Sequence, residues 1–486
     1  MKTALHRPTE QVALGPLGDA LTGWTTRNGP MYSRLADALA DAIAQGHLGL
    51  GSRLPSERAL AQHLRVARGT VVAAYDSLRA RGIVTTRRGS GTVVEIRAAK
   101  ARAHRAPLLS RLVNGHEVAI DLSIAAPLLD ASQAPEVSVS LTHAARLAPA
   151  HGYAPLGLPA LRAALAERFS ARGIPTETDQ ILITQGGQGA ISLIAAALLN
   201  VNGRVMTEAP TYPAAIEAFV RAGARVEGVE RDHAGVVIAS LEEVIATGSA
   251  RILYLIPTCH NPTGGVMSEG RRLATLRTAR ERGVRVIEDA VLEDLTFDGR
   301  KPSSLAALDP EQVITVGSLS KVIYGGLRVG WIRASSETIL RLGRLRASYD
   351  LGSPVLEQAA ALTLLDRYEE LAAARRELLE ARVSVLVEEL RGRLPEWRFQ
   401  EPRGGLCIWA ALPGVGADFF AQCALREGVA VSPGRSAAPG EEFLSHIRLC
   451  ASLAPDQLRE GVRRLAVAWE RAQLVSTLRE SEGVFV

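Results

Sequence analysis

The spacing of apolar and polar residues changes along this chain of 486 residues. Between residues 30 and 97 apolar side chains recur at helical spacing, as Leu35, Leu39 and Ile43 do on one face of the first segment. Beyond residue 119 short apolar runs alternate with helical segments, which is typical of an α/β sheet. The pattern therefore predicts a small helical domain followed by a large α/β domain.

The small domain has the element order of a winged helix-turn-helix. After a first helix, Ser56 is placed to cap a short second helix that ends near residue 64, and a brief link leads to a third helix over residues 68–81. Two β runs follow, at 83–86 and 92–94, and an arginine-rich turn joins them. This order of helices and hairpin predicts a DNA-binding domain.

Several side chains of this domain are candidates for contacts with DNA. Arg68 and Thr70 begin the third helix, where side chains and free backbone N–H groups reach phosphates or base edges. Two arginines flank the second helix and two lie on the wing. The candidate DNA-binding residues are Arg53, Arg58, Arg68, Thr70, Arg87 and Arg88. The alternative is a protein-interaction domain with a solvated basic face.

The net charge of +5 conceals an asymmetry along the chain. Residues 1–110 hold 16 Lys and Arg against 7 Asp and Glu, a net charge of +9, whereas the remainder holds 40 against 44. A basic terminal region is typical of a protein that binds a polyanion, although a solvated face would give the same count. Double-stranded DNA is the expected partner of this region.

The sequence also bears on the cellular compartment. The N-terminal segment lacks the apolar core and flanking charges of a secretory leader, and the longest apolar run, residues 190–199, is too short to cross a bilayer. The four cysteines, Cys259, Cys407, Cys423 and Cys450, show no close paired spacing, which indicates neither a disulfide framework nor a metal site. We therefore expect a cytoplasmic protein without a membrane partner.

Lysine is rare in this chain, because the 56 basic residues include only Lys2, Lys100, Lys301 and Lys321. Lys321 follows an apolar run over 313–316 and stands among Ser318, Ser320 and a Gly-Gly pair. A lysine amine, unlike a guanidinium, can lose its proton and condense with an aldehyde, and Ser318 and Arg328 are residue types that bind a phosphate. The pattern predicts pyridoxal phosphate held by Lys321 as a Schiff base. The alternative is a strand-end lysine in water.

A glycine-rich turn and a tyrosine could serve the same cofactor. The turn 185–189 opens an apolar helix over residues 190–199, so Gly187 and Gln188 are placed to hold a phosphate. Such turns also occur without a ligand. Tyr212 follows a predicted strand and either stacks on a flat ring or lies at an amphipathic rim.

Two further polar residues stand at strand ends. Asn261 follows a strand over 252–256 and either aims its amide at a ring oxygen or forms an Asx turn. Asp289 follows a strand over 284–288, at the edge where open α/β sheets bind ligands. A carboxylate buried there needs a cation such as a protonated pyridine nitrogen.

These motifs resemble two known families. The runs Leu54-Pro55-Ser56-Glu57-Arg58, Arg68-Gly69-Thr70-Val71 and Gly89-Ser90-Gly91-Thr92 resemble the GntR-family DNA-binding domain over about residues 30–95. The ordered features of the large domain resemble fold-type I pyridoxal phosphate enzymes of the class I aminotransferase group over about residues 119–470. A chain with both parts is similar to the MocR family of bacterial regulators.

The aminotransferase resemblance implies a role for each candidate residue. Lys321 would form the internal aldimine, and Asp289 would pair with the pyridinium. Asn261 would bond the phenolic oxygen of the ring, on which Tyr212 would stack. The implied phosphate ligands are Gly187, Gln188, Ser318 and Arg328, with Tyr153 reaching in from a partner subunit. Arg448, in the run His446-Ile447-Arg448-Leu449, would clamp a substrate carboxylate.

One departure from that pattern affects the expected activity. The family usually has a tyrosine two or three residues after the ring-nitrogen aspartate, whereas this chain has Ala290, Val291 and Leu292 after Asp289. The tyrosine bonds the phenolic oxygen and tunes the aldimine. Its absence puts efficient catalysis in doubt more than it does cofactor binding.

The sequence thus predicts an α/β protein with an N-terminal winged helix-turn-helix and a large fold-type I aminotransferase-like domain whose sheet is mixed and mostly parallel. The expected parts are an arm (1–29), the winged helix (30–97), a linker (98–118), the cofactor domain (119–470) and a tail (471–486). We expect a homodimeric DNA-binding regulator that senses pyridoxal phosphate, an amine or an amino acid through an aldimine. The alternatives are an aminotransferase with an accessory DNA-binding domain and a cofactor-free dimerisation scaffold.

Overall fold

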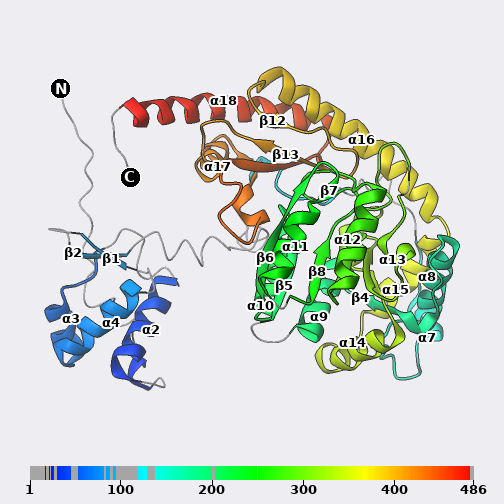
Figure 1. The fold of residues 1–486 in the computed structure, drawn as a ribbon, viewed down its shortest axis with the longest axis horizontal. Coiled ribbons are helices and arrows are strands. Elements are labelled where there is room, and N and C mark those ends of the chain that lie inside the picture. Colours follow the sequence, from blue (N-terminus) through cyan, green and yellow to red (C-terminus); the bar gives the residue numbers. More distant parts are fainter. Residues whose placement is uncertain are drawn as a thin grey trace. The chain divides into compact units, whose positions relative to one another are not determined.

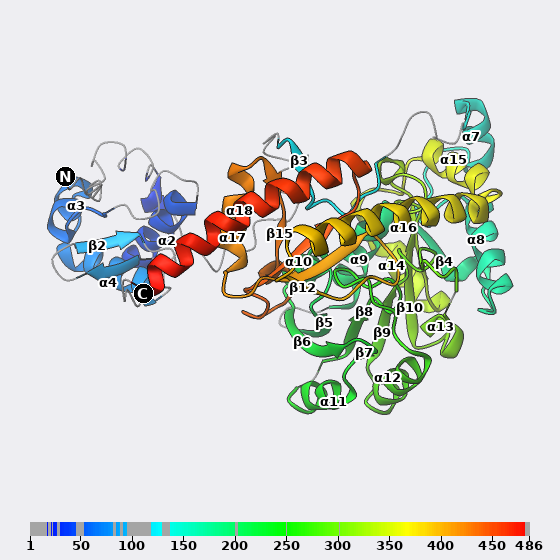
Figure 2. The ribbon, with the colours of Figure 1, turned by 90° about the horizontal axis from the view of Figure 1, so that it is seen from above.

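The computed structural model describes residues 17, 21, 23–26, 30–44, 53–80, 84–87, 91–94, 118–128, 137–199, 203–248, 250–300 and 302–481. The chain forms two compact units, residues 1–106 and 107–486, whose division falls within the segment expected to be a linker. Figures 1 and 2 show the elements of both units in two views. Within the described residues no helix has the length and apolar character needed to cross a membrane.

The N-terminal unit has the predicted helices and hairpin. Its main elements are α2 (Met31–Ala44), α3 (Glu57–Leu64), α4 (Arg68–Ala80), β1 (Val84–Arg87) and β2 (Gly91–Val94). The Ser56 hydroxyl caps α3 by accepting a hydrogen bond from the N–H of Ala59 at 3.2 Å, as predicted. The three helices bury Leu35, Leu60 and Tyr75 in a common core, and β1 and β2 pair as an antiparallel hairpin.

The arm expected over residues 1–29 is wrong in part, because some of its residues belong to the core of the N-terminal unit. Leu17, Leu21 and Trp24 are buried in the same apolar core as α2 and α4, and a single turn, η1 (Trp24–Thr26), lies among them. These three residues follow a helical spacing, which the surrounding polar, proline and glycine residues obscured. The core of the N-terminal unit therefore includes residues from before α2.

The large unit is organised around a sheet of eight strands. They are β4 (Ile181–Thr184), β5 (Arg204–Ala209), β6 (Arg225–Asp232), β7 (Gly235–Val236), β8 (Ile252–Leu255), β9 (Arg285–Asp289), β10 (Val313–Ser318) and β11 (Gly330–Arg333). Their order is β4-β11-β10-β9-β8-β5-β6-β7. The pairs among β10, β9, β8, β5 and β6 are parallel, whereas β11 is antiparallel to both neighbours and β7 to β6. The sheet is mixed and mostly parallel, as predicted.

Both faces of this sheet are covered, because successive residues of β8 enter different apolar clusters. Leu253 and Leu255 pack on one side, and Tyr254 packs on the other. The elements of this part include α7 (Leu141–Leu147), α8 (Pro159–Ala171), α9 (Gly186–Leu198), α10 (Pro213–Arg221), α11 (Ile238–Ala246), α12 (Glu269–Glu281), α13 (Leu305–Leu308), α14 (Ser336–Tyr349) and α15 (Val355–Leu365). The carboxyl ends of β9 and β10, which precede Lys321, are thus held between two packed layers.

A smaller sheet and two long helices complete the large unit. The sheet has the order β12 (Arg398–Phe399), β13 (Cys407–Ala411), β16 (His446–Cys450), β15 (Ser432–Pro433). The helices α16 (Tyr368–Arg393) and α18 (Pro455–Ser481) pack side by side and share an apolar cluster with β13, β16 and α17 (Ala417–Arg426). Near the linker, β3 (Ile120–Asp121) pairs with β14 (Val429–Ala430).

The expected C-terminal tail is also wrong in part. Helix α18 continues to Ser481, and Ala472 is fully buried in the cluster beneath it. The apolar spacing that carries Trp469 into the core includes Ala472, so the helix does not end at residue 470. The large unit therefore includes a long terminal helix.

Candidate cofactor-binding site

The side chain of Lys321 lies in a loop three residues beyond β10. Its Nζ donates a hydrogen bond to the backbone oxygen of Ala125 at 2.5 Å. Burial lowers the pKa of the Lys321 amine below its ordinary value, and the positive charge of Arg448 lowers it further. A lowered pKa increases the neutral fraction of the amine, which is the form that attacks an aldehyde.

The side chain of Asp289 ends β9 and is buried beside the same loop. Its Oδ2 accepts a hydrogen bond from the hydroxyl of Tyr254 at 2.5 Å, and its Oδ1 accepts one from the N–H of Val291 at 3.1 Å. Burial raises the pKa of the Asp289 carboxyl, although Tyr254 and the charge of Lys321 act in the opposite direction. A cation placed against this carboxylate would restore the charged form.

Sequence reasoning missed Tyr254. It lies on β8, 35 residues before Asp289, and β8 pairs directly with β9. A tyrosine inside a fully buried strand was the available signal, because a buried hydroxyl needs a partner. It does not replace the family's usual tyrosine, since its hydroxyl bonds Asp289.

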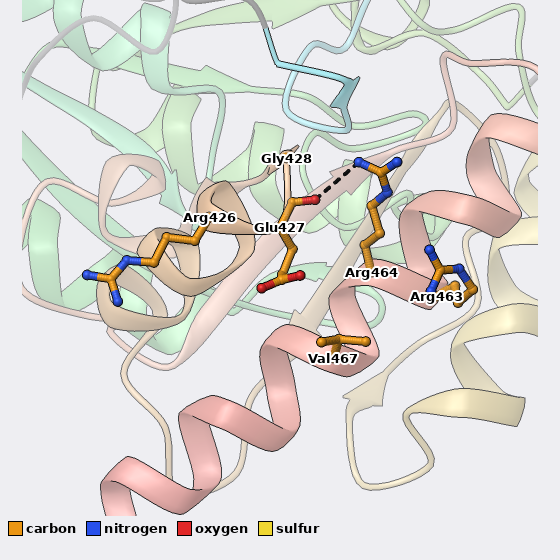
Figure 3. Close-up of a pocket in the computed structure, with 6 residues that line it drawn as sticks. All are labelled: Arg426, Glu427, Gly428, Arg463, Arg464 and Val467. Carbon is orange, nitrogen blue, oxygen red and sulfur yellow. Dashed lines mark hydrogen bonds between the residues drawn. The ribbon is translucent and has the colours of Figure 1, made fainter.

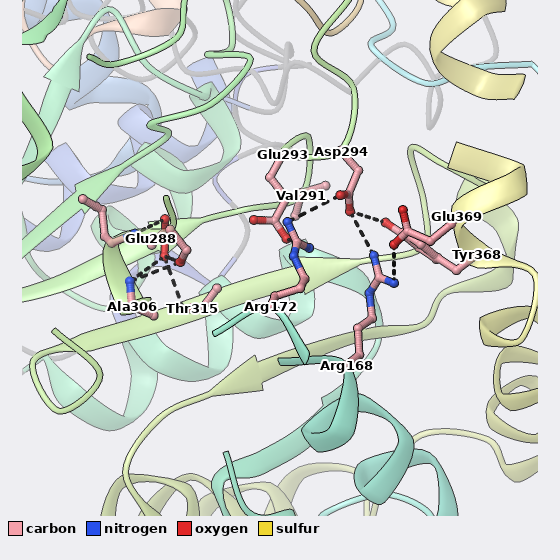
Figure 4. A network of polar contacts seen from close by, with 12 residues as sticks. Arg168, Arg172, Glu288, Val291, Glu293, Asp294, Ala306, Thr315, Tyr368 and Glu369 are labelled. Carbon is pink, nitrogen blue, oxygen red and sulfur yellow. Dashed lines mark hydrogen bonds and ion pairs between the residues drawn. The ribbon is translucent and has the colours of Figure 1, made fainter. Parts of the chain in front are cut away.

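Charged contacts fix the segment that follows Asp289, as Figure 4 shows. Arg172 pairs with Glu293 at 2.7 Å, and the carboxylate of Asp294 accepts hydrogen bonds from Arg168 at 3.4 Å and from the hydroxyl of Tyr368 at 2.9 Å. Just before Asp289, Glu288 accepts the N–H groups that begin α13. The backbone on both sides of Asp289 is therefore held in place.

Arg448 and Asn261 meet directly. Arg448 projects from β16 and is 2% exposed. Its Nη1 donates to Oδ1 of Asn261 at 3.0 Å, and its Nη2 donates to the backbone oxygen of Ser123 at 2.7 Å. The Nε of Arg448 is buried without a hydrogen-bond partner in the described part of the chain. With its oxygen bonded to Arg448, Asn261 presents its amide nitrogen as the free donor.

Tyr212 is half-buried at the start of α10. Burial and the charge of Asp289 raise the pKa of Tyr212 to about 12, although Arg448 acts in the opposite direction. The phenol therefore lies near two other residues of the site, Asp289 and Arg448. The neutral phenol ring suits stacking on a flat aromatic ligand.

The residues predicted to bind the phosphate lie around the start of α9, which begins earlier than predicted. Helix α9 begins at Gly186 and not at residue 190, so Gly187 and Gln188 lie in its first turn, where backbone N–H groups are free. A Cβ on Gly187 would lie 2.9 Å from a methyl carbon of Val291 and 3.9 Å from Cβ of Ser318. The lack of a side chain therefore keeps this cradle open.

Arg328 borders the same turn. It adopts a left-handed conformation with φ of 52°, and its Nη2 donates to the backbone oxygen of Gln185 at 2.6 Å. The Ser318 hydroxyl bonds Ser320 at 2.8 Å and the backbone oxygen of Val329 at 3.1 Å. These contacts hold a hydroxyl and a guanidinium near the open start of α9.

Two predicted cofactor residues have other contacts. The side-chain nitrogen of Gln188 donates to the backbone oxygen of Ala214 at 3.0 Å, which leaves its Oε1 buried without a partner among the described residues. Tyr153 is 56% exposed and stacks on His151 with ring centroids 5.7 Å apart. Its loop contacts the loop after α14 through a bridge from Ala154 to Gly352. Tyr153 is thus presented at the surface of this unit.

The backbone oxygens of four successive residues, Leu122–Ala125, accept hydrogen bonds from residues in and around the site. The oxygen of Leu122 accepts from the N–H of Cys450 at 2.8 Å, and that of Ile124 accepts from the hydroxyl of Ser452 at 2.7 Å. The oxygens of Ser123 and Ala125 accept from Arg448 and Lys321, as described above. This segment, here called the strap, follows closely in the chain after the division between the two units.

The structure describes the side chains of four DNA candidates in the N-terminal unit, and two of these are exposed. Arg58 is exposed, and the exposed Arg68 forms a 3.4 Å ion pair with Glu57. Arg53 reaches the hairpin, because it forms a bridge with Val93 and a Cβ on Gly91 would lie 2.8 Å from its Nε. Thr70 is half-buried in the first turn of α4. Arg87 ends β1, but its side chain and all of Arg88 lie outside the described residues.

An arginine-lined pocket lies between the end of α17 and α18, as Figure 3 shows. It is lined by Arg426, Glu427, Gly428, Arg463, Arg464 and Val467. Arg463 and Arg464 both pair with Glu460, so one carboxylate offsets half of the charge of these two side chains. It shares no residue with the Lys321 site.

The residues around Lys321 fit pyridoxal phosphate. The free N–H groups and open cradle at Gly187, beside Ser318 and Arg328, suit its phosphate. The buried carboxylate of Asp289 suits its ring nitrogen. The partnerless Nε of Arg448 leaves a buried donor that a bound carboxylate would satisfy.

Comparison with known proteins divides the chain as the sequence does. Residues 117–465 match the family described as aminotransferase class I and II, and residues 31–94 match the gntR family of bacterial regulatory proteins. The transcriptional regulator YisV of Bacillus subtilis is 30% identical, over 92% of this chain and 97% of that protein. The probable rhizopine catabolism regulatory protein MocR of Rhizobium meliloti is 28% identical, over 90% and 94%.

The large unit also resembles solved aminotransferases. The α-aminoadipate aminotransferase LysN of Thermus thermophilus, complexed with N-(5'-phosphopyridoxyl)-L-leucine, is 30% identical and superposes with a TM-score of 0.69 over 77% of this chain and 97% of that chain. A class I and II aminotransferase domain with such a neighbour implies pyridoxal phosphate as the cofactor.

Proposed function

We propose, on the premise that this chain belongs to the MocR-type transcriptional regulators, that its large unit senses pyridoxal phosphate or a carboxylate-bearing amine and transmits the result to DNA binding. The observation that carries this proposal is that one segment, the strap, accepts hydrogen bonds from two residues of the site. Lys321 and Arg448, the groups that would hold cofactor and effector, both donate to carbonyls of that segment. Ligands that recruit these donors must alter their contacts with the strap.

Each side chain of the site has a proposed task. Pyridoxal phosphate supplies an aldehyde and a ring that withdraws electrons. Lys321 binds the aldehyde through its amine, and Asp289, held by Tyr254, keeps a proton on the ring nitrogen. Asn261 donates its amide to the ring oxygen, and Tyr212 covers the ring face. The proposed phosphate ligands are Gly187, Gln188, Ser318 and Arg328, joined by Tyr153 from the partner subunit of a homodimer.

An effector with a carboxylate fits Arg448. Its Nε has no partner among the described residues, and its guanidinium is held rigidly by Asn261 and Ser123. A bidentate pair with a carboxylate would satisfy the free donor. The amine of the same effector would compete with Lys321 for the aldehyde, so an amino acid satisfies both ends of the site.

The strap offers a route from this site to the DNA-binding unit. A ligand that takes up the Lys321 amine changes its contact with Ala125, and an effector on Nε of Arg448 binds the same guanidinium that holds Ser123. The chain preceding the strap leads to the N-terminal unit. By linkage, the effector can change the free energy of DNA binding only by the difference between its own binding free energies for two arrangements of the strap.

The N-terminal unit is proposed to bind DNA through the start of α4 and its wing. Arg68 and Thr70 would reach base edges or phosphates, with Arg53, Arg58, Arg87 and Arg88 on the backbone. A homodimer would present two such units to paired half-sites. Cytoplasmic location follows from this proposed role.

An aminotransferase activity is the second candidate, because Lys321, Asp289 and Arg448 lie together in one site. The residues after Asp289 provide no tyrosine, and Tyr254 is occupied by Asp289. We therefore expect transamination to be slow. Its measurement with amino acids and 2-oxo acids separates the two functions.

The first test is the visible absorption of the full-length protein with pyridoxal phosphate. The wild-type protein should show a band that borohydride fixes covalently to the peptide containing Lys321. Lys321→Ala should lose this band, whereas Lys301→Ala should keep it. Addition of an amino acid should shift the band and change operator affinity together. Covalent fixation to Lys321→Ala, or effector binding without any change in DNA affinity, would refute the proposal.

A further inference from the structure

Two thiols face each other beside the lysine of the proposed cofactor site. Cys407 on β13 and Cys450 on β16 are register partners in antiparallel strands, and their sulfur atoms are 3.5 Å apart. Both are free cysteines and are buried, with 3% and 0% of their surface exposed. Separated by 43 residues in sequence, they gave no spacing signal.

The position of the pair suits a bond between the sulfur atoms. The N–H of Ala451 donates to the oxygen of Leu406 at 2.8 Å, whereas the N–H of Cys450 turns away to Leu122. Cys407 and Cys450 therefore form a non-hydrogen-bonded pair, for which the Cα atoms lie about 4.5 Å apart. This separation lies within the range that a disulfide spans, and only a small movement of the sulfur atoms is required.

The pair is close to both cations of the site. Arg448 precedes Cys450 by two residues and shares its face of β16. Leu319 and Val322, which flank Lys321 in the chain, belong to the same apolar cluster as both cysteines. The hydrogen bond with Cys450 and the charges of Arg448 and Lys321 together lower the pKa of the Cys407 thiol to about 7, despite its burial. The lowered pKa increases the thiolate fraction of Cys407, which is the form that attacks a peroxide.

We propose that Cys407 and Cys450 form a site of reversible oxidation, at which a small hydroperoxide converts the dithiol into a disulfide and changes the charge around Lys321 and Arg448. With hydrogen peroxide, the sulfur of Cys407 attacks one oxygen and the O–O bond breaks, which gives a sulfenic acid and water. The sulfur of Cys450 then attacks that sulfur, the S–S bond forms and a second water leaves. The two thiols give up two electrons and two protons, and the peroxide accepts them.

Oxidation has a defined effect on the lysine. Burial and the charge of Arg448 lower the pKa of Lys321, whereas negative charge on Cys407 raises it. A disulfide cannot ionise, so the effect of this thiolate is lost while the other effects persist, and the Lys321 amine stays neutral to lower pH. This effect on Lys321 rests on the proposed function, whereas formation of the disulfide does not.

The disulfide is tested by exposing the full-length protein to hydrogen peroxide, alkylating the remaining thiols and mapping the peptides. Two of the four free thiols should no longer react with the alkylating agent, and the map should contain a peptide pair that joins Cys407 to Cys450. Dithiothreitol should restore both thiols. The matched control is Cys423→Ser, which alters a different buried cysteine and should keep the link. Cys450→Ser should abolish it. Four unreacted thiols, a link to another cysteine, or oxidation that thiols do not reverse would overturn the proposal.

A second measurement separates the oxidation site from the cofactor proposal. The visible band of bound pyridoxal phosphate is followed against pH in reduced and oxidised protein. Its midpoint should move to lower pH on oxidation in the wild-type and Cys423→Ser proteins, and should not move in Cys450→Ser. A mapped disulfide with an unchanged midpoint would overturn the effect on Lys321. Absence of a band in every form would refute the cofactor role of Lys321, while the peptide map would still decide the oxidation.

Discussion

In the N-terminal unit the arginines on α3 and α4 face solvent, whereas in the large unit several arginines are among the most deeply buried side chains. The side chain of Arg68 is 70% exposed, but Arg272, Arg333 and Arg448 have at most 2% of their surface exposed. An exposed guanidinium keeps its water and gains little from one surface ion pair. It remains available to an external polyanion.

A buried guanidinium must instead find protein acceptors for its N–H groups. Arg272 donates to the oxygens of Pro257 at 2.9 Å and Met267 at 3.1 Å and to the hydroxyl of Thr258 at 2.8 Å. Arg448 differs, because its Nε has no partner within the described residues. The comparison teaches that a buried arginine with an unused donor is a candidate ligand site, whereas a fully bonded one is structural.

The largest effect is expected for Arg272→Met. The change leaves several buried acceptors unsatisfied in the loop that carries Asn261, and should lower the free energy of unfolding by about 3 to 5 kcal/mol. Urea unfolding of the full-length protein measures this loss. Arg277→Met, on the exposed side of the same helix, is the matched control and should change stability by less than about 0.5 kcal/mol. Equal losses in both variants would show that burial of the guanidinium does not decide its contribution.

Asp289 is a buried anion that, like a buried arginine, needs a partner of opposite charge. Asp289→Asn should weaken pyridoxal phosphate binding by about 2 to 3 kcal/mol. Only the ionised carboxylate pairs with the protonated ring, so wild-type affinity should fall as pH drops through the raised pKa of Asp289. Because a raised carboxyl pKa costs stability as pH rises through it, the asparagine variant without cofactor should be the more stable protein at neutral pH. Absorbance titrations and urea unfolding at several pH values measure both effects. Stronger cofactor binding by the variant would contradict the proposed pairing.

Arg448→Lys sharpens the distinction between structural and ligand-binding arginines. Lysine keeps the positive charge but cannot make the planar bidentate pair, so affinity for an amino acid should fall by about 2 kcal/mol. Affinity for the corresponding amine without a carboxylate should stay the same. Spectral titration with the two compounds makes this comparison. A similar loss for both compounds would assign Arg448 to the scaffold.

The smallest effect is expected for Arg68→Ala, because its charge is exposed to solvent and salt. Operator binding should weaken by about 1 kcal/mol, and the slope of log affinity against log salt should decrease in magnitude by about 1. Arg79→Ala, which removes an exposed arginine near the other end of α4, is the matched control. Fluorescence anisotropy at several salt concentrations measures both variants. An unchanged slope for Arg68→Ala would remove this side chain from the phosphate contacts.

Local signals were sufficient for much of the fold. The strands before Asp289 and Lys321, the cap at Ser56 and the helices α3 and α4 all follow from apolar spacing and capping residues within short windows. The misplaced start of α9 shows the limit of this method. Glycine has poor helix propensity, yet Gly187 lies in the first turn of α9, and Gly186 begins the helix with φ of 73°, a conformation that glycine adopts readily.

The missed features of the candidate site depend on contacts between distant segments. Tyr254 meets Asp289 because β8 and β9 are neighbours, and Cys407 meets Cys450 because β13 and β16 pair in one register. Lys321 bonds Ala125 across 196 residues of sequence. No local pattern encodes such pairings, since a shift of one residue in strand register would turn each side chain to the other face.

The strand order of the large sheet also has a consequence for protein synthesis. β4 pairs with β11, which is synthesised much later, and β16, which carries Arg448, emerges later still. The described core residues of the N-terminal unit lie between Leu17 and Val84, and its hairpin ends at Val94, so these elements can form once residue 94 has left the ribosome. We expect the DNA-binding unit to fold first, because its contacts are local and those of the sheet are not. A translation product that stops before β16 would therefore carry a finished DNA-binding unit without the arginine that is proposed to receive the effector.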